Sequence, residues 1–570
     1  MFEILAASVI SNLLIYIYGC IFSRYFFTKN FSNNENFSEH SIFGIIFLSF
    51  IALIINFFIP LNKIVGTAII IIGIIPGFLI IKNLINKNKF LLFLFYNALI
   101  TIVLLYASNI NRPDAGLYHL PYTSLINENK IIIGSANIHF RFGHISIIQY
   151  LSAIYNNYLF NTSNITLPLA SVFSIFLIFS IKKMSEHLKS GTNEIAFLIF
   201  LILIYSIYSF NRYSSYGNDM PTHIYFFILC IFFLELVKLK SCSIEDFYEI
   251  ALICIFLIAL KNFMILVSVI PIILFFASKK KFNLFINPLF IISCLFLFSW
   301  LFRNFLSSGC IIYPLQLSCL DNLTYSNFQQ TINEQLAGEA WSKGWSDQKN
   351  IVIPYEQYIK NFNWVKTWAH VHLNQIYSKF IPFLIFLFFL FFFIISKNFY
   401  SQKIMSRKIK LKQNFYILHF LSLLFSIIWF LKFPLYRYGQ SFLAIFFILT
   451  IYLCFVKFLN INNKINFKKL YQVVLSTGLV LFCLKNFIRI SKDSVEKYNH
   501  YPWPKIYTLN EKDNNFKKKF KLIVRDNKDL YYYSDGELCM YSKTPCSNYK
   551  LDNLRAKKIF NYSVYFINNN

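Results

Sequence analysis

The stretch FLLFLFYNALITIVLLYASNINRPDAGLYH (residues 90–119) decides the fold, because a long apolar run ends there at a cluster of polar residues. Apolar runs of about 17 to 23 residues recur along the chain, and each is long enough to cross a hydrocarbon core of roughly 30 Å. Of the 570 residues, 56% are hydrophobic and 14% are charged, whereas a soluble domain carries about 25% charged residues. The sequence therefore predicts an all-α polytopic membrane protein.

The positive charge lies between the apolar runs and not on one soluble surface. A net charge of +28 would suit a nucleic-acid partner, but this spacing is typical of cytoplasmic loops between spans. We therefore expect membrane lipids as partners and no nucleic acid. The basic clusters that we place in the cytoplasm are Arg24/Lys29, Lys82/Lys87/Lys89, Lys182/Lys183/Lys189, Lys238/Lys240, Lys279/Lys280/Lys281, Lys397 to Lys412 and Lys457 to Lys469.

The loop charges set the expected topology, with about 14 spans. The first run is expected to be a retained helix, because it lacks the basic leader and the cleavage site of a signal peptide. Both chain ends then lie outside the cytoplasm, together with the loops 109–165, 211–221 and 303–375. The spans are expected to begin near residues 4, 41, 64, 90, 166, 195, 221, 247, 263, 285, 376, 413, 440 and 468.

The cysteines test this orientation independently. Cys310 and Cys319 share one expected outer loop, and Cys539 and Cys546 share the expected outer tail. An oxidising compartment favours a disulfide in each pair, and the alternative is four unpaired thiols, because sequence alone does not give the Cα geometry. No Cys-x-x-Cys pairing with histidine indicates a zinc site.

Two domains are expected. Residues 1–487 contain the spans and form a transmembrane domain. Residues 488–570 are polar enough to be soluble, and the segments "KLIVR", "LYYY" and "ELCMY" are typical of short strands. We therefore expect a small α/β extramembrane domain on the outer, periplasmic side.

The polar segment after the fourth run contains the candidate chemistry. Asp114 is placed at the outer membrane surface, and Tyr118 and His119 follow it closely. Apolar residues then recur at helical intervals but are interrupted by Asn, His and Arg, which is typical of helices that lie along the membrane interface. We expect two such helices, near 117–128 and 144–158.

An acid after an early span, followed by Tyr118-His119 and two interfacial helices, resembles the first outer loop of the GT-C membrane glycosyltransferases. That superfamily includes the protein O-mannosyltransferases and the lipid A aminoarabinose transferases. The resemblance is strongest over residues 105–180 and extends loosely to about 450. A single acid in "RPDAG" stands where relatives commonly carry a pair, and more spans precede it than in most relatives.

This resemblance implies a GT-C-like fold and the transfer of a sugar, with inversion, from a polyprenyl-phosphate carrier to a cell-envelope or lipid-linked acceptor. It implies that Asp114 is catalytic and that the reaction occurs at the outer face. Most of the chain also resembles a group of bacterial multi-span membrane proteins that share "SGCIIYPLQLSC" and a late "ELCMYSKTPCSNY" segment. That second likeness implies a bacterial cytoplasmic membrane and brings no reaction with it.

The expected reaction gives roles to particular side chains. Phosphate is a good leaving group, so the main need is a base for the acceptor hydroxyl, for which Asp114 is best placed, with His119 beside it. Asp219, in the second outer loop, is expected to be an auxiliary acid. The departing phosphate needs cations, ideally the bidentate fork of arginine. The expected substrate-binding residues are Tyr118, Arg141, Lys261, Arg303 and Arg437, and His139 and His144 are further candidates.

Each candidate also has an ordinary structural explanation. Asp114 could be a turn acid, and Asp219 could cap the helix that follows it. Lys261 and Arg437 could extend their charged tips to the membrane surface along apolar stems. The stretch "EAWSKGWSDQKN" (residues 339–350) is interpreted as a loop that rests on the membrane.

Two other functions stay open on the sequence. A polysaccharide or lipid transporter would break helices at the midplane and place charges deep within spans, whereas the polar residues here cluster at outer helix ends. A non-enzymatic envelope assembly protein would leave Asp114 and Asp219 far apart and facing no cavity. The sequence indicates no certain cofactor; a divalent metal is possible, although one carboxylate per loop is few for a metal site.

Overall fold

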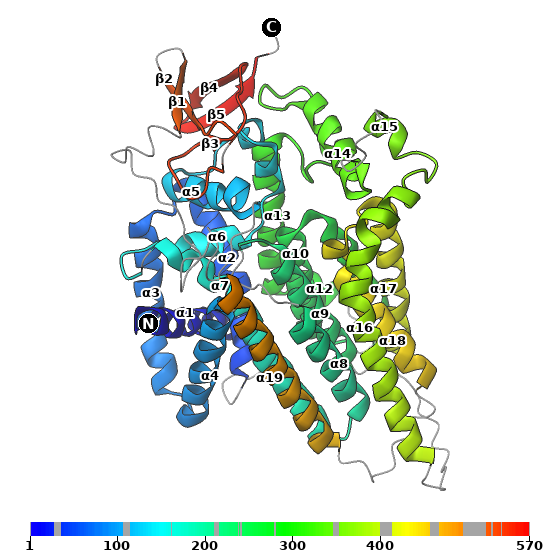
Figure 1. Cartoon of the computed structure of the whole chain (residues 1–570). Coiled ribbons are helices and arrows are strands. Elements are labelled where there is room, and N and C mark those ends of the chain that lie inside the picture. Colours follow the sequence, from blue (N-terminus) through cyan, green and yellow to red (C-terminus); the bar gives the residue numbers. More distant parts are fainter. Residues whose placement is uncertain are drawn as a thin grey trace.

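The computed structural model is mostly helical and carries small β-sheets near its C-terminal end (Figure 1). Much of the basic clusters near 397–412 and 457–469, and of the loop 211–221, lies outside the described residues. The structure describes residues 2–27, 36–106, 114–160, 162–209, 216–236, 239, 242–278, 281–345, 353–399, 413–455, 467–493, 520–525, 528–536 and 538–568.

Long apolar helices make up most of the molecule. Within the described ranges, nine helices are long and apolar enough to cross a membrane, which indicates a membrane protein. These helices are α1 (Phe2–Phe26), α2 (Phe37–Phe58), α3 (Lys63–Lys82), α4 (Lys87–Tyr106), α7 (Leu167–Ser190), α13 (Pro288–Ser308), α16 (Val365–Phe399), α17 (Gln413–Lys432) and α18 (Tyr436–Phe455).

The other expected spans also coincide with helices, but these are shorter or less apolar, so the expected number of 14 spans is not confirmed. Three of them, α8, α9 and α10, have 17 residues each, a rise of about 26 Å. Most of their side chains are buried, so neighbouring helices surround them. This group consists of α8 (Asn193–Ser209), α9 (Asp219–Glu235), α10 (Ile244–Leu260), η7 (Asn262–Ser268) with α11 (Val269–Ala277), and α19 (Phe467–Asp493).

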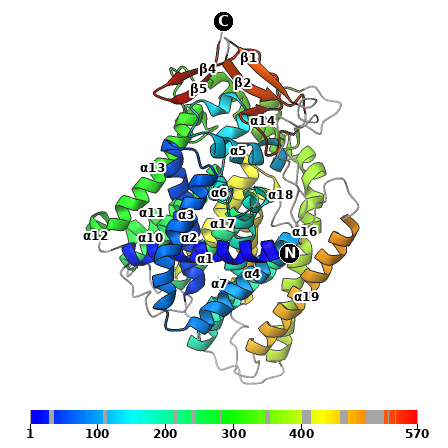
Figure 2. The ribbon, with the colours of Figure 1, turned by 90° about the vertical axis from the view of Figure 1, so that its left-hand side faces the viewer.

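The first helix crosses its neighbours instead of lying beside them. α1 runs across α2 and α3 in two views at right angles (Figures 1 and 2). Two glycines permit this approach: a β-carbon on Gly19 would lie 1.8 Å from the carbonyl oxygen of His40, and one on Gly44 would lie 1.9 Å from that of Ile15. The backbones of α1 and α2 are therefore in direct contact where the two helices cross. The hydropathy of the sequence does not predict the direction in which α1 crosses α2.

The apolar stretch 247–278 folds back on itself at Lys261. α10 ends just before this residue, which adopts extended backbone, and η7 begins just after it. The thiol of Cys254 donates a weak hydrogen bond to the carbonyl oxygen of Val267 at 3.7 Å. The returning chain thus lies alongside α10, and Lys261 stands at the turn.

The segment between α4 and α7 forms more short helices than the two expected. α5 and α6 correspond to the helices expected near 117–128 and 144–158, and both are buried within the protein. The short helices are η2 (Ala115–His119), α5 (Leu120–Glu128), η3 (Ser135–Asn137), η4 (Phe140–His144), α6 (Ile148–Ile154) and η5 (Thr162–Thr166).

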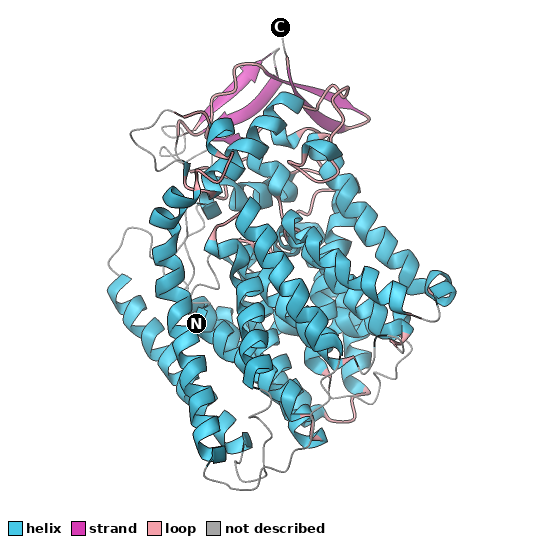
Figure 3. Ribbon diagram, turned by 90° about the vertical axis from the view of Figure 1, so that its right-hand side faces the viewer, coloured by secondary structure: helices cyan, strands magenta, loops and turns pink. Residues whose placement is uncertain are grey.

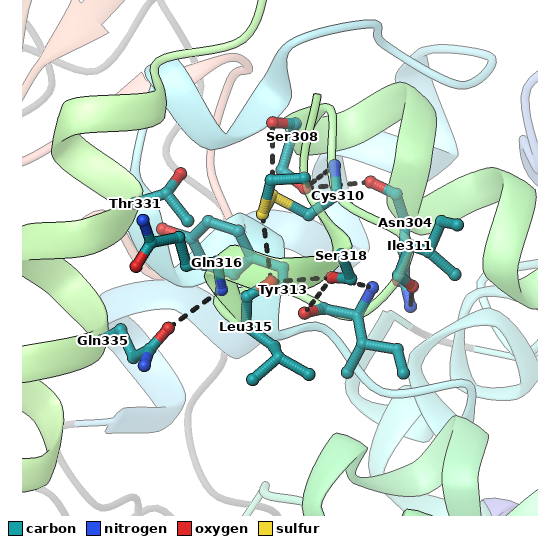
Figure 4. Close-up of a disulfide and its surroundings, with 12 residues drawn as sticks. Asn304, Ser308, Cys310, Ile311, Tyr313, Leu315, Gln316, Ser318, Thr331 and Gln335 are labelled. Carbon is teal, nitrogen blue, oxygen red and sulfur yellow. Dashed lines mark hydrogen bonds between the residues drawn. A yellow bond between two sulfur atoms is a disulfide. The ribbon is translucent and has the colours of Figure 1, made fainter. Parts of the chain in front are cut away.

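The loop 303–375 folds over one end of the bundle, the same end as α5 and the sheets (Figure 1). Figure 3 shows the strands at this end from another side. The expected disulfide Cys310–Cys319 is confirmed. Inside the loop that it closes, the backbone N–H of Gln316 donates to Oε1 of Gln335 at 2.9 Å, which ties this loop to α14 (Figure 4). The helices of this part of the chain are α12 (Lys281–Ile286), η8 (Gln316–Ser318), α14 (Phe328–Ser342) and α15 (Tyr355–Tyr358).

The described residues from 520 onward form strands and loops, without the helical part expected for an α/β tail. The order of the first sheet is β1-β2-β3, with β1 and β2 antiparallel and β2 and β3 parallel; β4 and β5 form a hairpin. The second expected disulfide, Cys539–Cys546, is confirmed, and α19 continues beyond the expected boundary at 487. The strands are β1 (Lys521–Arg525), β2 (Lys528–Tyr533), β3 (Cys546–Ser547), β4 (Leu554–Ile559) and β5 (Tyr562–Ile567).

The C-terminal region packs directly on the segment that follows Asp114. The backbone N–H of Met540 donates to the carbonyl oxygen of Gly116 at 2.8 Å. The hydroxyl of Ser124 donates to the backbone carbonyl oxygen of Ser542 at 2.5 Å. A β-carbon on Gly116 would lie 2.2 Å from the sulfur of Met540, so a larger residue there would displace the Met540 side chain. The loop closed by the Cys539–Cys546 disulfide therefore packs against η2 and α5.

Candidate active site

A cavity of about 1070 Å³ lies between the helix bundle and the segment that contains α14. Its walls come from η2, η4, η7, α9, α14 and α18, which are far apart in the sequence. Arg303 does not line it. The other seven residues that the sequence predicts for catalysis or substrate binding do line it, and they are Asp114, Tyr118, His119, Arg141, Asp219, Lys261 and Arg437.

Asp114 faces this cavity in an ion pair with Arg437. Nη1 of the arginine lies 3.1 Å from Oδ2 of the aspartate. Asp114 precedes η2, a five-residue π-helix, and its carboxylate makes no capping hydrogen bond to that helix; short π-helices are often found at functional sites. Because 41% of the Asp114 side chain is exposed, a molecule in the cavity can reach the carboxylate.

A second ion pair lies beside the first and joins Asp219, the first residue of α9, to Lys261. The ring of Tyr438 lies between the two cations: its centre is 3.8 Å from Nζ of Lys261 and 5.1 Å from the guanidinium carbon of Arg437. Nη2 of Arg437 also donates to the Tyr438 hydroxyl at 3.3 Å. The two ion pairs and this ring, which can stabilise both cations, form one connected cluster.

His119 is a buried, neutral imidazole whose proton is on Nε2. The backbone N–H of Ser146 donates to Oε1 of Gln149, which fixes the orientation of that amide. The Gln149 amide nitrogen then donates to Nδ1 of His119 at 3.1 Å and to its carbonyl oxygen at 3.2 Å. Burial lowers the pKa of His119 to about 4, against the opposing effect of Asp114. His119 can therefore donate a hydrogen bond from Nε2, but its Nδ1 is not available as a base.

Arg141 is a further cation that lines the cavity. Its guanidinium carbon lies 4.9 Å from the ring centre of Phe140 and 5.6 Å from that of Tyr118. No carboxylate in the described part of the chain lies within ion-pair distance of it, and its Nε has no hydrogen-bond partner there. Burial raises the pKa of Tyr118, and Asp114 raises it further, so this phenol keeps its proton and can donate it in a hydrogen bond.

The two further histidine candidates have different surroundings. His144 lines the cavity, with its ring centre 5.0 Å from that of Tyr313. His139 is buried outside the lining, and its Nδ1 accepts the backbone N–H of Arg141 at 3.1 Å. His139 therefore helps to position Arg141 and does not face a substrate.

Arg303 does not have the expected position for a phosphate contact. It is 1% exposed, and Nη2 donates to the hydroxyl of Tyr122 at 2.7 Å and to the carbonyl oxygen of Phe142 at 2.9 Å. Its Nε also donates to the hydroxyl of Tyr150 at 3.3 Å. These partners belong to α5, η4 and α6, so Arg303 holds three elements together and fixes the backbone next to Arg141.

One protein family matches a part of the chain that contains all of these residues. A family model described as a domain of unknown function (DUF8201) matches residues 1–444. The chain belongs to this family. No curated protein and no solved structure matches it. The DUF8201 match extends from α1 into α18 and contains the cavity, and the C-terminal sheets follow it.

Some residues that line the cavity were not expected from the sequence. They include Glu334 and Trp341 of α14 as well as Tyr438. With 20% aromatic residues in the chain, single aromatic side chains carry little information. The helical spacing between Glu334 and Trp341 was the available signal, but the stretch 339–350 was interpreted as a loop, whereas its start belongs to α14.

The described residues do not fit a divalent metal ion. No group of three or more His, Cys, Asp or Glu side chains in the described part of the chain is placed to hold one. Asp114 and Asp219, the expected acids, each have a cationic partner.

Proposed function

We propose that this protein is a membrane glycosyltransferase of GT-C type. It moves a sugar from a polyprenyl-phosphate donor to a hydroxyl group of a cell-envelope or lipid-linked acceptor. The observation that carries this proposal is that two ion pairs and one further arginine share the lining of one cavity. The ion pairs are Asp114 with Arg437 and Asp219 with Lys261, and the further arginine is Arg141.

Asp114 is the base in this reaction. The acceptor hydroxyl gives its proton to the Asp114 carboxylate, and its oxygen forms a bond to the anomeric carbon of the donor sugar. The bond from that carbon to the phosphate oxygen breaks, and its electron pair leaves on the phosphate. Attack from the side opposite the phosphate inverts the anomeric centre.

The cations stabilise the charge that develops on the phosphate. Arg141 has no carboxylate within ion-pair distance in the described part of the chain, so it is available to a phosphate from the start. When Asp114 takes the proton its charge disappears, and Arg437 can turn its fork to the phosphate oxygens. Lys261 is held by Asp219 and adds positive charge beside them.

The size of the cavity and its place in the chain also support this proposal. Pockets for small molecules occupy about 300 to 1000 Å³, so about 1070 Å³ has room for a sugar phosphate and an acceptor group. The basic clusters favour an orientation in which α14 and the sheets lie on the outer side of a bacterial cytoplasmic membrane. A lipid-linked donor would then meet its acceptor at the outer face.

The two alternative functions agree less well with this arrangement. An assembly protein would not need Asp114 and Asp219 in one cavity, each beside a cation. A transporter would place its charges near the midplane, whereas this cavity reaches the outer segment α14. Both alternatives stay testable by the same variant.

The test is Asp114→Asn in the native host, with Asp321→Asn as the matched control. Asp321 is exposed and lies outside the cavity lining. We expect the Asp114 variant, present at the wild-type level, to give the envelope glycans of a deletion strain, and the Asp321 variant to give those of the wild type. Wild-type glycans in cells that carry Asp114→Asn would exclude the transferase.

A further inference from the structure

One wall of the cavity is a helix face that the reaction described above does not use. Glu334, Gln335, Gly338 and Trp341 of α14 all line the cavity. Residues three and four positions apart share one face of a helix, so these side chains form a continuous strip. The strip is fixed at one end, because Oε1 of Gln335 accepts the N–H of Gln316 in the disulfide loop (Figure 4).

At Gly338 and Trp341 this strip offers an exposed, flat surface. A β-carbon on Gly338 would have no atom within 4 Å, so there is free space beside the helix at this point. Trp341, one turn further on, is 41% exposed. Its ring centre lies 5.7 Å from the guanidinium carbon of Arg437, and Arg437 is the partner of Asp114. A molecule that packs on Trp341 is therefore next to the proposed base.

Glu334 and Gln335 add hydrogen-bonding groups to the same strip. The carboxyl of Glu334 has neither a hydrogen bond nor an ion pair with any described residue, although it lines the cavity. Burial raises its pKa, and Arg141 partly offsets this effect. The amide nitrogen of Gln335 can still donate, because only its oxygen is used by Gln316. The strip thus offers acceptors and donors beside an apolar indole.

We propose that this face of α14 is the subsite for the acceptor, and that the acceptor group bound there is a saccharide ring. This inference rests on the proposed function. A pyranose has an apolar face of C–H groups, which packs on an indole ring, and an edge of hydroxyl groups, which pairs with carboxyl and amide groups. A ring stacked on Trp341 above Gly338 directs one hydroxyl toward Asp114 and the others toward Glu334 and Gln335.

The experiment measures contact between sugars and the full-length protein in nanodiscs by saturation-transfer NMR. The probes are methyl β-D-glucopyranoside, methyl α-D-mannopyranoside and methyl N-acetyl-β-D-glucosaminide. Gly338→Leu fills the open space while favouring the helix, so its effect does not come from unfolding, and Trp341→Ala removes the indole. Gln329→Leu is the control, because Gln329 is exposed on α14 outside the cavity lining.

We expect saturation of the C–H face of at least one glycoside with the wild type, at least a five-fold loss with Gly338→Leu and Trp341→Ala, and no loss with Gln329→Leu. Asp114→Asn should keep the contact, because it changes the base and not the platform. Equal contact in all variants, or no contact with any probe, overturns the subsite. If Asp114→Asn leaves the envelope glycans unchanged but Gly338→Leu removes the contact, the transferase is wrong and the saccharide site stands.

Discussion

Arg303 and Arg437 both occur in apolar helices, and the structure uses them differently. Arg437 faces the cavity and pairs with Asp114, whereas Arg303 is enclosed by neutral oxygen atoms. Removing the Arg303 guanidinium leaves the carbonyl oxygen of Phe142 without its donor. A buried group left unpaired costs about 1 to 3 kcal/mol.

We therefore predict that Arg303→Met lowers the free energy of unfolding by a few kcal/mol, on the order of the cost of several unpaired groups. Thermal unfolding in detergent measures this loss. Arg24→Met is the control, because Arg24 is exposed at the end of α1. An unchanged melting temperature for Arg303→Met would show that the hydrogen bonds of Arg303 do not stabilise the fold.

The buried histidines predict how stability depends on pH. Burial lowers the pKa of His119 to about 4 and that of His139 to about 3, from 6.5. Each histidine therefore binds a proton more tightly in the unfolded chain than in the folded protein. The stability that comes from keeping both histidines neutral is fully present above about pH 6.5 and is lost as the pH falls toward 4 and 3. At pH 5 the loss is about 2 kcal/mol for each histidine.

Unfolding of the wild type and of His119→Gln/His139→Gln at pH 7.5 and 5.0 measures this dependence. The double variant is expected to have a smaller difference in unfolding free energy between the two pH values than the wild type has. If both proteins lose the same stability between these pH values, His119 and His139 are not its cause.

At the scale of helices, the crossing of α1 and α2 gives a matched pair of variants. A β-carbon on Gly44 meets the backbone of Ile15, which cannot move aside, whereas a β-carbon on Gly338 meets nothing. Overpacking costs about 1 to 3 kcal/mol, occasionally more, while Gly to Ala in an open helix position gains up to about 1 kcal/mol.

We predict that Gly44→Ala lowers the melting temperature and that Gly338→Ala keeps it or raises it. Thermal unfolding of the two variants in the same detergent is sufficient for this comparison. A Gly44→Ala protein as stable as the wild type would mean that the close crossing of the two backbones is absent.

The positions of the long apolar helices were predictable, because apolar runs indicate where such helices lie. The direction of α1 was not, since it depends on a backbone contact between Gly19 and Gly44 that no periodicity reveals. The turn at Lys261 was visible as an interruption of one apolar stretch. The burial of α5 and α6 was not, because it depends on distant parts of the chain: Ser542 packs on α5, and Arg303 of α13 donates a hydrogen bond to Tyr150 of α6.

Over the whole molecule, two polar clusters stand at opposite ends of the bundle. Lys183 lies 3.0 Å from both Glu39 and Glu235, and His187 lies 2.9 Å from Glu235. Glu39 belongs to the first turn of α2, and the last turn of that helix packs near α5. The cavity and its ion pairs therefore lie toward the other end from this cluster.

The residues of the cavity were predictable to the extent that they follow the ends of apolar runs. Asp114, Asp219, Lys261 and Arg437 all stand at such ends, where a polar side chain in an apolar sequence is informative. The spacing from Glu334 to Trp341 could have indicated the helix α14, but its place in the cavity wall was not predictable from the sequence. Only the fold brings that helix over the bundle.

The most direct test of the central claim is the amount of donor left in the membrane. Mass spectrometry of extracted lipids gives the ratio of polyprenyl-phosphate-linked sugar to free polyprenyl phosphate in native hosts that carry the wild type, Asp114→Asn or Asp321→Asn. If Asp114 is the base of a transferase, this ratio rises in the Asp114 variant and stays at the wild-type value in the Asp321 variant. A wild-type ratio in cells that contain normal amounts of the Asp114 variant would contradict the proposed reaction.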